Sequence, residues 1–236
     1  MKKHFSVPLA WHFACVQSFF LCLCLLQTAE AQNLVFAKGF TNSASLGSST
    51  NRGIVLDGAG NRYITGYFNG AVDFDPGAGT QNLTSAGSND IFLAKYDASG
   101  NYVWAKGMGG IGFEMGYSLA VDASGNSYIT GQFTGTVDFD PGSGTQNLTT
   151  TGNADIFLAK YDASGNYMWA QQIGATNNDI GYALAVDASG NSYITGYFNG
   201  TVDFDPGAGT QDLISTGNAD IFLAKYDASG NYVWAK

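Results

Sequence analysis

The chain has 236 residues, with 10 Lys and Arg against 19 Asp and Glu, and a formal net charge of −9. Its three Cys and two His all lie before residue 25. The acidic balance argues against nucleic acid and anionic membrane surfaces as partners. The chain after residue 24 lacks the commonest general base, the thiol nucleophile and the usual transition-metal ligands, which argues against an enzyme.

Residues 1–31 have the layout of a secretory signal peptide. Lys2 and Lys3 give a basic start, an apolar run follows from about Phe5 to Leu26, and small residues precede a cleavage point before Gln32. The alternative is an uncleaved membrane anchor. We expect cleavage, no membrane span afterwards, and a secreted, extracellular or cell-surface location. Without Lys2, Lys3 and Glu30, eight basic and eighteen acidic side chains remain, a formal charge of −10.

The rest of the chain repeats with a period of 65 residues. One phrase begins at Asp57, Asp122 and Asp187, and residues 122–166 match residues 187–231 at 39 of 45 positions. A fixed period of this length predicts an array, solenoid or propeller, in which each unit packs against its neighbours.

Within one unit, apolar and polar residues alternate over 117–121, and residues 127–133 are rich in β-branched and aromatic side chains, which predicts two strands. The runs at 156–161 and 167–173 are the predicted third and fourth strands. Asp-Ala-Ser-Gly-Asn turns at 122–126 and 162–166 separate them, and we expect plain hairpin turns there. Ile156 and Leu158 face opposite to Phe157 and Ala159, so both sheet faces are apolar, as in a sheet between two neighbours. The predicted fold is all-β, with β-propeller blades of four antiparallel strands per 65-residue repeat.

A polar stretch at 134–154 separates the second and third strands, and we expect it to form an arm on the propeller rim. Its Asp-Phe-Asp-Pro-Gly motif places two carboxylates on one face and recurs in every unit, giving the pairs Asp73 and Asp75, Asp138 and Asp140, and Asp203 and Asp205. These pairs are candidate Ca²⁺ ligands. A purely structural alternative is that the Asp residues cap turns while Phe139 fills a gap between blades. A third possibility is that each pair acts as the acid and base for glycoside cleavage.

Two other side chains recur at fixed positions. Trp104, Trp169 and Trp234 occupy the same place in the fourth strand, where we expect packing between blades rather than a sugar-binding surface. Lys95, Lys160 and Lys225 follow apolar runs, and we expect them to reach solvent from the sheet edge.

The phrases ALAVDASGNSYITGYF and ADIFLAKYDASGNYVWA resemble the SBBP repeat of seven-bladed β-propellers, common in exported bacterial proteins. The Val-Asp-Phe-Asp-Pro-Gly arm resembles a variant frequent in the Bacteroidetes. The resemblance covers essentially all of 34–236. It implies the propeller fold, and it implies no catalytic residues, because the family has no agreed set to transfer.

The repeat units run over about 34–101, 102–166 and 167–231, within a repeat domain at 32–236. Leu34–Lys38 matches a fourth strand, and another fourth strand follows the last unit at 232–236. Three units give an incomplete ring, so we expect a fragment of a longer propeller. The alternative is self-association of chains through open blade faces.

The sequence therefore predicts an exported, non-enzymatic binding or interaction scaffold. Its expected partner is a protein or glycan surface, with no cofactor other than the possible Ca²⁺. One alternative is a polysaccharide hydrolase or lyase that uses Asp and Tyr. Another is a structural spacer within a larger adhesin.

Overall fold

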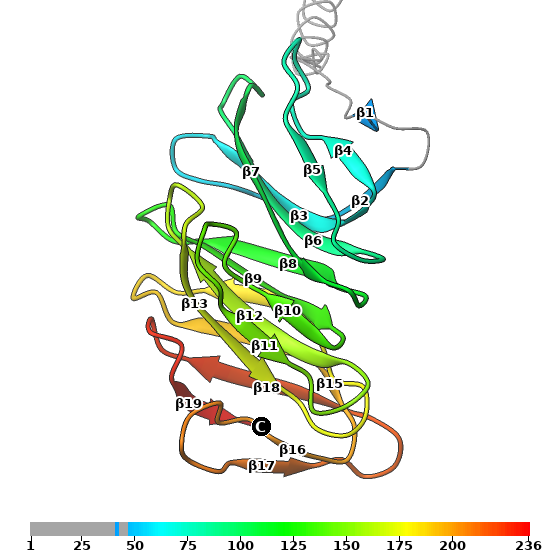
Figure 1. Ribbon diagram of the computed structural model, residues 1–236. Coiled ribbons are helices and arrows are strands. Elements are labelled where there is room, and N and C mark those ends of the chain that lie inside the picture. The colour runs from blue at the N-terminus through cyan, green and yellow to red at the C-terminus, as the bar shows by residue number, and fades with distance from the viewer. Residues whose placement is uncertain (1–40, 43–46) are drawn as a thin grey trace, which may run out of the picture. The chain divides into compact units, whose positions relative to one another are not determined.

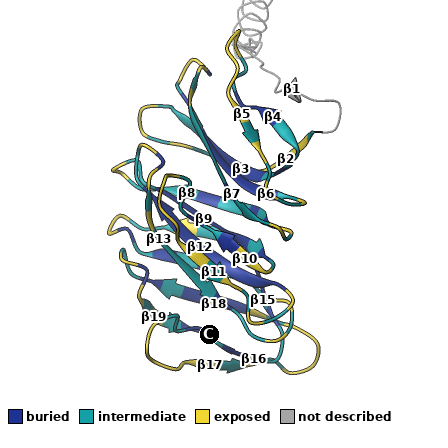
Figure 2. Cartoon of the chain, viewed as in Figure 1, coloured by how far each residue is buried: buried dark blue, intermediate teal, exposed yellow. Residues whose placement is uncertain are grey.

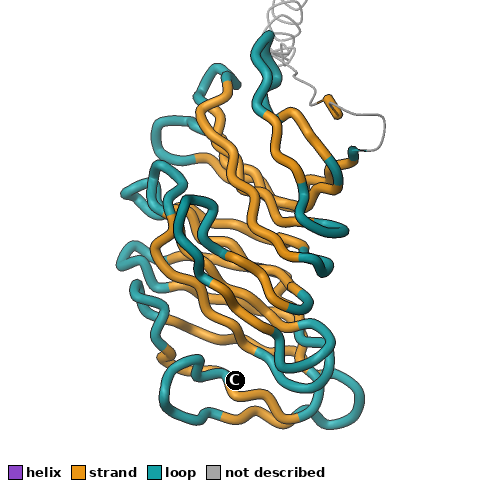
Figure 3. The backbone as a smooth tube through the Cα atoms, in the orientation of Figure 1, coloured by secondary structure: helices purple, strands orange, loops and turns teal. Residues whose placement is uncertain are grey.

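The computed structural model describes residues 41–42 and 47–236, which lie in one compact unit spanning Lys38–Lys236. The predicted signal peptide and the strand at Leu34–Lys38 fall outside the described residues. Strands joined by loops and turns make up the described part, and no helix occurs in it (Figure 3). A helix long and apolar enough to cross a membrane is accordingly not found among these residues.

The described residues form three blades, each an antiparallel sheet of four strands in sequence order (Figure 1). Blade 1 contains β2 (Ser48–Leu56), β3 (Arg62–Asn69), β6 (Asp90–Tyr96) and β7 (Tyr102–Gly110). Blade 2 contains β8 (Met115–Val121), β9 (Ser127–Phe133), β12 (Asp155–Tyr161) and β13 (Tyr167–Ile173). Blade 3 contains β14 (Ile180–Val186), β15 (Ser192–Phe198), β18 (Asp220–Tyr226) and β19 (Tyr232–Ala235). The all-β prediction and the four-stranded blades are confirmed, and the described residues close no ring.

The blades are out of phase with the repeat units read from the sequence. The last strand, β19, pairs with β18 and so supplies the fourth strand of blade 3. The three sheets accordingly cover 48–110, 115–173 and 180–235. A unit boundary drawn at the second Asp-Ala-Ser-Gly-Asn turn cuts each blade before its fourth strand.

Each predicted arm is a short hairpin between the second and third strands of its blade. The three hairpins are β4 (Ala71–Asp73) with β5 (Asn82–Thr84), β10 (Thr136–Asp138) with β11 (Asn147–Thr149), and β16 (Thr201–Asp203) with β17 (Asp212–Ile214). The hairpin of blade 2 also pairs with β7 of blade 1, which makes a six-stranded sheet. The backbone of β1 (Thr41–Asn42) pairs with β4 at the equivalent residues.

The tight turns have the predicted form. In the turn at 122–126, Oδ1 of Asp122 accepts the N–H groups of Ser124 and Asn126, and Oδ2 accepts the Asn126 amide at 2.8 Å. Gly125 has φ +80°, which is open to glycine and rarely adopted by other residues. The carboxylate therefore satisfies the backbone of the turn, and the plain hairpin interpretation is confirmed.

The core lies between successive blades, because both faces of the middle blade are apolar. Every residue of β12 is buried, Phe157 and Ala159 belong to the cluster shared with blade 1, and Ile156 and Leu158 belong to the cluster shared with blade 3 (Figure 2). In blade 3 the equivalent of Ile156 is Ile221, which is 85% exposed. The described residues thus cover this face of the sheet in blade 2 and leave it open in blade 3.

Candidate functional site: the arms and the blade junctions

The carboxylates of the Asp-Phe-Asp motif hold the loop of their own arm. Oδ1 of Asp138 accepts the N–H groups of Asp140 at 3.0 Å and Gln146 at 2.8 Å. Oδ1 of Asp140 accepts the N–H of Gly142 at 2.8 Å. The pairs Asp73 and Asp75, and Asp203 and Asp205, make the same bonds in the other two arms.

This geometry is what the turn-cap alternative requires. Each pair uses two of its four carboxylate oxygens on backbone N–H groups. No group of three or more His, Cys, Asp or Glu that could hold a metal occurs among the described residues. Calcium at these three pairs stays a prediction, since bound Ca²⁺ takes 6 to 8 oxygens and would need backbone carbonyls and water beside them.

The phenylalanine of the motif anchors each arm in the core. Phe139 is fully buried and packs against the rings of Phe133 and Phe157, at centroid distances of 5.5 and 5.2 Å. Its carbonyl accepts the hydroxyl of Tyr161 at 3.0 Å. It belongs to the cluster between blades 1 and 2, as the turn-cap alternative expected. The arm is therefore fixed to the blade at its root, and its loop is exposed.

Two buried carboxylates lie at each blade junction, and the sequence analysis missed them. At the first junction, between blades 1 and 2, they are Asp90 and Glu114; at the second, between blades 2 and 3, they are Asp155 and Asp179. Burial raises the pKa of Asp90, which the N–H groups of Ala86 and Gly87 oppose. Burial also raises the pKa of Glu114 to about 7, with the Gly110 N–H opposing and the nearby Asp90 charge adding to the shift.

The two junctions satisfy these carboxylates differently. Asp179 accepts N–H groups on both oxygens, from Ala175 at 2.8 Å and Asn199 at 2.9 Å. Glu114 accepts one, from Gly110 at 3.2 Å, and its Oε1 is buried without a hydrogen-bond partner. The first junction is therefore the less satisfied of the two.

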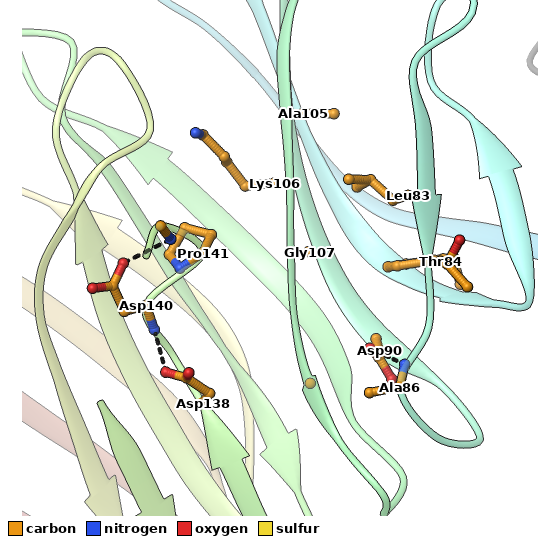
Figure 4. A pocket seen from close by; sticks show the side chains of 13 residues that line it. Leu83, Thr84, Ala86, Asp90, Ala105, Lys106, Gly107, Asp138, Asp140 and Pro141 are labelled. Atoms are coloured by element: carbon orange, nitrogen blue, oxygen red, sulfur yellow. Dashed lines mark hydrogen bonds between the residues drawn. The ribbon is translucent and has the colours of Figure 1, made fainter. Parts of the chain in front are cut away.

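A cleft of about 400 Å³ opens at the first junction, beside the arms of blades 1 and 2. Figure 4 shows Asp138 and Asp140 on one side of it and Leu83, Thr84 and Asp90 on the other. Lys106 also lines it, but its amino group points away from Asp90 (Figure 4). Of the six predicted ligand residues, only Asp138 and Asp140 line this cleft; Asp73, Asp75, Asp203 and Asp205 lie in the other two arms.

At the opposite end of the blades, Trp and Lys side chains connect one blade to the next. Trp104 donates to the carbonyl of Ala163 at 3.3 Å, and Trp169 donates to that of Ala228 at 3.2 Å, which confirms packing between blades. The expectation for Lys160 is wrong. It is 6% exposed, lies over the Tyr128 ring and donates to the Ala228 carbonyl at 3.2 Å, because the next blade covers it.

Comparisons with known proteins found one family model and several similar proteins. Residues 169–202 match the family model SBBP, described as a beta-propeller repeat, which confirms the predicted resemblance. The chain is 27% identical over 207 residues to an uncharacterized WD repeat-containing protein of Acanthamoeba polyphaga mimivirus, covering 77% of this chain and 15% of that protein. It is 28% identical over 149 residues to the regulatory protein FlaEY of Caulobacter vibrioides, a match that covers 61% of this chain and 15% of that protein.

The chain spans about 15% of the length of these curated relatives. Among solved structures, a protein of unknown function from Bacteroides caccae aligns over 80% of this chain and 81% of its own, with 10% identity and a TM-score of 0.27. The four-stranded blades and the repeat match at residues 169–202 together give the described residues the architecture of β-propeller blades.

Proposed function

We propose that this chain is an exported, non-enzymatic interaction scaffold that binds a protein or glycan surface through the loops of its arms. The observation that supports it is the repetition of one arm. Each arm is anchored by a buried Phe, each loop is held by the same Asp bonds, and each loop tip is exposed. A binding surface gains avidity from repeated copies, whereas a single catalytic centre gains nothing from them.

The arms also limit what the motif can do as an acid/base pair. Oδ1 of each Asp already accepts backbone N–H groups, and glycoside cleavage needs two carboxyls placed on either side of a substrate. The proposal assigns the arms a role in shape and hydrogen bonding, which their Asp carboxylates already have within each loop.

A test uses the loop tips, where Thr80, Thr145 and Thr210 are exposed and equivalent. A Thr→Glu change is made in one, two or all three arms, and binding is measured on a glycan array and a panel of surface proteins. We expect avidity to fall stepwise with each arm changed. Release of new sugar ends from any glycan would overturn the non-enzymatic assignment, and the absence of any ligand would favour the spacer alternative.

We extend the proposal to export and to self-association. The basic and apolar layout of residues 1–31 supports export, and N-terminal sequencing of the secreted protein should begin at Gln32.

The exposed Ile221 and Leu223 on the open face of blade 3 support self-association, since their equivalents in blade 2 are fully buried. Light scattering should show multimers that Ile221→Lys dissociates; an unchanged monomer would contradict this.

A further inference from the structure

The two junctions carry equivalent carboxylates with different donors. Oδ2 of Asp155 accepts the N–H and the hydroxyl of Thr151 at 2.8 and 3.2 Å, and the amide Nε2 of Gln172 at 2.6 Å. One period earlier, Ala86 stands in place of Thr151 and Gly107 in place of Gln172. Oδ2 of Asp90 retains the backbone donor, Ala86 N–H at 2.8 Å, and lacks both side-chain donors.

Solvent does not replace the missing donors, because Asp90 is buried. It is 4% exposed, and its Oδ1 is buried without a hydrogen-bond partner. It lines the cleft, which occupies the space next to Gly107. A buried carboxylate that lacks two of the three donors of its counterpart Asp155, beside an open volume, is a site for a group that brings its own N–H donors.

The lining indicates what kind of group this is. Phe68 and Leu83 give the cleft an apolar wall, which suits an aliphatic stem. Three carboxylates, those of Asp90, Asp138 and Asp140, line it against one cation, Lys106, whose amino group points away from Asp90. A positive charge at the end of the stem is therefore favoured over a neutral amide.

We propose that this cleft binds a primary ammonium on an aliphatic stem, the lysine side chain of a polypeptide partner. Asp90 accepts the ammonium hydrogens, as Asp155 accepts the Gln172 amide, and Phe68 and Leu83 pack against the methylenes. The proposal rests on the interaction-scaffold function and identifies the chemistry of one partner group.

The chain supplies a matched pair of variants. Gly107→Gln should close the cleft by reproducing the second junction; a Cβ at this position would lie 3.4 Å from the Phe68 ring, an ordinary contact. Gln172→Gly should open an equivalent cleft at Asp155. Asp90→Asn keeps the shape and removes the charge, which covers the case in which Gly107→Gln fails to fold.

The probe is Nα-acetyl-lysine methylamide, titrated into the full chain and followed by the amide NMR signals of Ala86 and Gly87. We expect saturable shifts in the wild type, at least tenfold weaker binding in Gly107→Gln and Asp90→Asn, and a second set of shifts at Thr151 in Gln172→Gly. The norleucine analogue, which has the stem without the ammonium, should leave the signals unmoved.

Equal shifts in the wild type and Asp90→Asn, or none in the wild type, would overturn the proposal. A response to glucosamine without one to the lysine probe would overturn the polypeptide assignment. The loop-tip Thr→Glu variants should bind the probe normally. Arms that still bind their surface while the lysine probe fails would leave the proposed function standing without this inference.

Discussion

The first and second blade junctions have the same apolar core and different polar connections. At the first, β10 of the arm pairs with β7 of the preceding blade, Val137 opposite Gly110 and Asp138 opposite Gly109. At the second, β16 pairs only with its hairpin partner β17 in the sheets, and side chains make the link. Asn177 donates to the Asn199 carbonyl at 3.3 Å, and Asp179 accepts the Asn199 N–H.

One residue difference at the seam contributes to these different connections. A Cβ on Gly110 would lie 2.1 Å from the carbonyl oxygen of Thr136, so this close approach of the two strands favours glycine there. Ala175 stands at the equivalent position of the second junction, and β13 ends before it, at Ile173. A near-identical repeat can thus vary how its units connect by changing a few residues at the seam and leaving the core unchanged.

The largest expected effect is the loss of stability when the apolar core that both junctions share is truncated. Phe139→Ala and Phe204→Ala each remove a fully buried ring from an equivalent core, and each should cost about 3 to 5 kcal/mol of unfolding free energy. Chemical denaturation measures both, with the 91% exposed Ile111→Ala as a near-neutral control. If the loss of unfolding free energy in one variant were less than half of that in the other, the two cores would not be equivalent.

The next effect concerns pH and Glu114. Because its folded pKa of about 7 lies above its ordinary value of 4.5, the folded chain retains a proton between these pH values that the unfolded chain has released. Stability should therefore fall as pH rises through this window, by about 1 to 3 kcal/mol. Glu114→Gln should remove this part of the dependence in denaturation curves measured at pH 4.5 to 8.

Asp179→Asn is the matched variant at the second junction. Both Asp179 oxygens accept N–H groups, so an amide there places a donor against a donor and should destabilise the chain even below pH 5.

A pH profile of Glu114→Gln that matches the wild type would contradict the assignment of a raised pKa to Glu114.

A smaller effect comes from exchanging the residues that distinguish the two carboxylates. Gln172→Gly removes the 2.6 Å bond to Asp155 and should cost about 1 to 2 kcal/mol. Gly107→Gln should give Asp90 that bond and add up to about 1 kcal/mol. Urea unfolding of both variants measures the pair, and opposite signs are the expected result; destabilisation by Gly107→Gln would mean that the junctions are not interchangeable.

The smallest effect is calcium. If the arms bind it, a concentration equal to the dissociation constant should stabilise the fold by about 0.4 kcal/mol for each occupied site. Asp138→Asn combined with Asp140→Asn should then weaken one of three sites. Melting curves with millimolar calcium and with chelator test this, and identical curves would leave the six Asp residues as loop caps only.

The period of the sequence predicted the blades and turns because those features depend on local pattern. Alternating and apolar runs predicted the strands. The Asp-Ala-Ser-Gly-Asn phrase predicted the turns, because its hydrogen bonds form within five residues. The packing of Trp104 followed from its place in a strand with two apolar faces. All of these depend on neighbours that are close in the chain or repeat with it.

The features that escaped prediction depend on contacts across one period. Lys160 is buried because Ala228, 68 residues later, offers its carbonyl. The pairing of β10 with the preceding blade joins residues of two units. The sequence did contain a signal for the cleft, since Gly107 and Gln172 are equivalent positions that differ, and such a difference marks where the surroundings of equivalent residues differ.

Native-state hydrogen exchange tests most directly whether the arms connect the blades as described. The N–H of Asp138 in β10 faces β7, because alternation turns the N–H groups of its neighbours Val137 and Phe139 toward β11. The Asp138 amide should exchange at least tenfold more slowly than the equivalent amide of Asp203, because β10 belongs to a six-stranded sheet and β16 to a two-stranded one. Gly110→Ala should bring the two rates together. Equal exchange in the wild type, or an Asp138 rate unaffected by Gly110→Ala, would contradict the account.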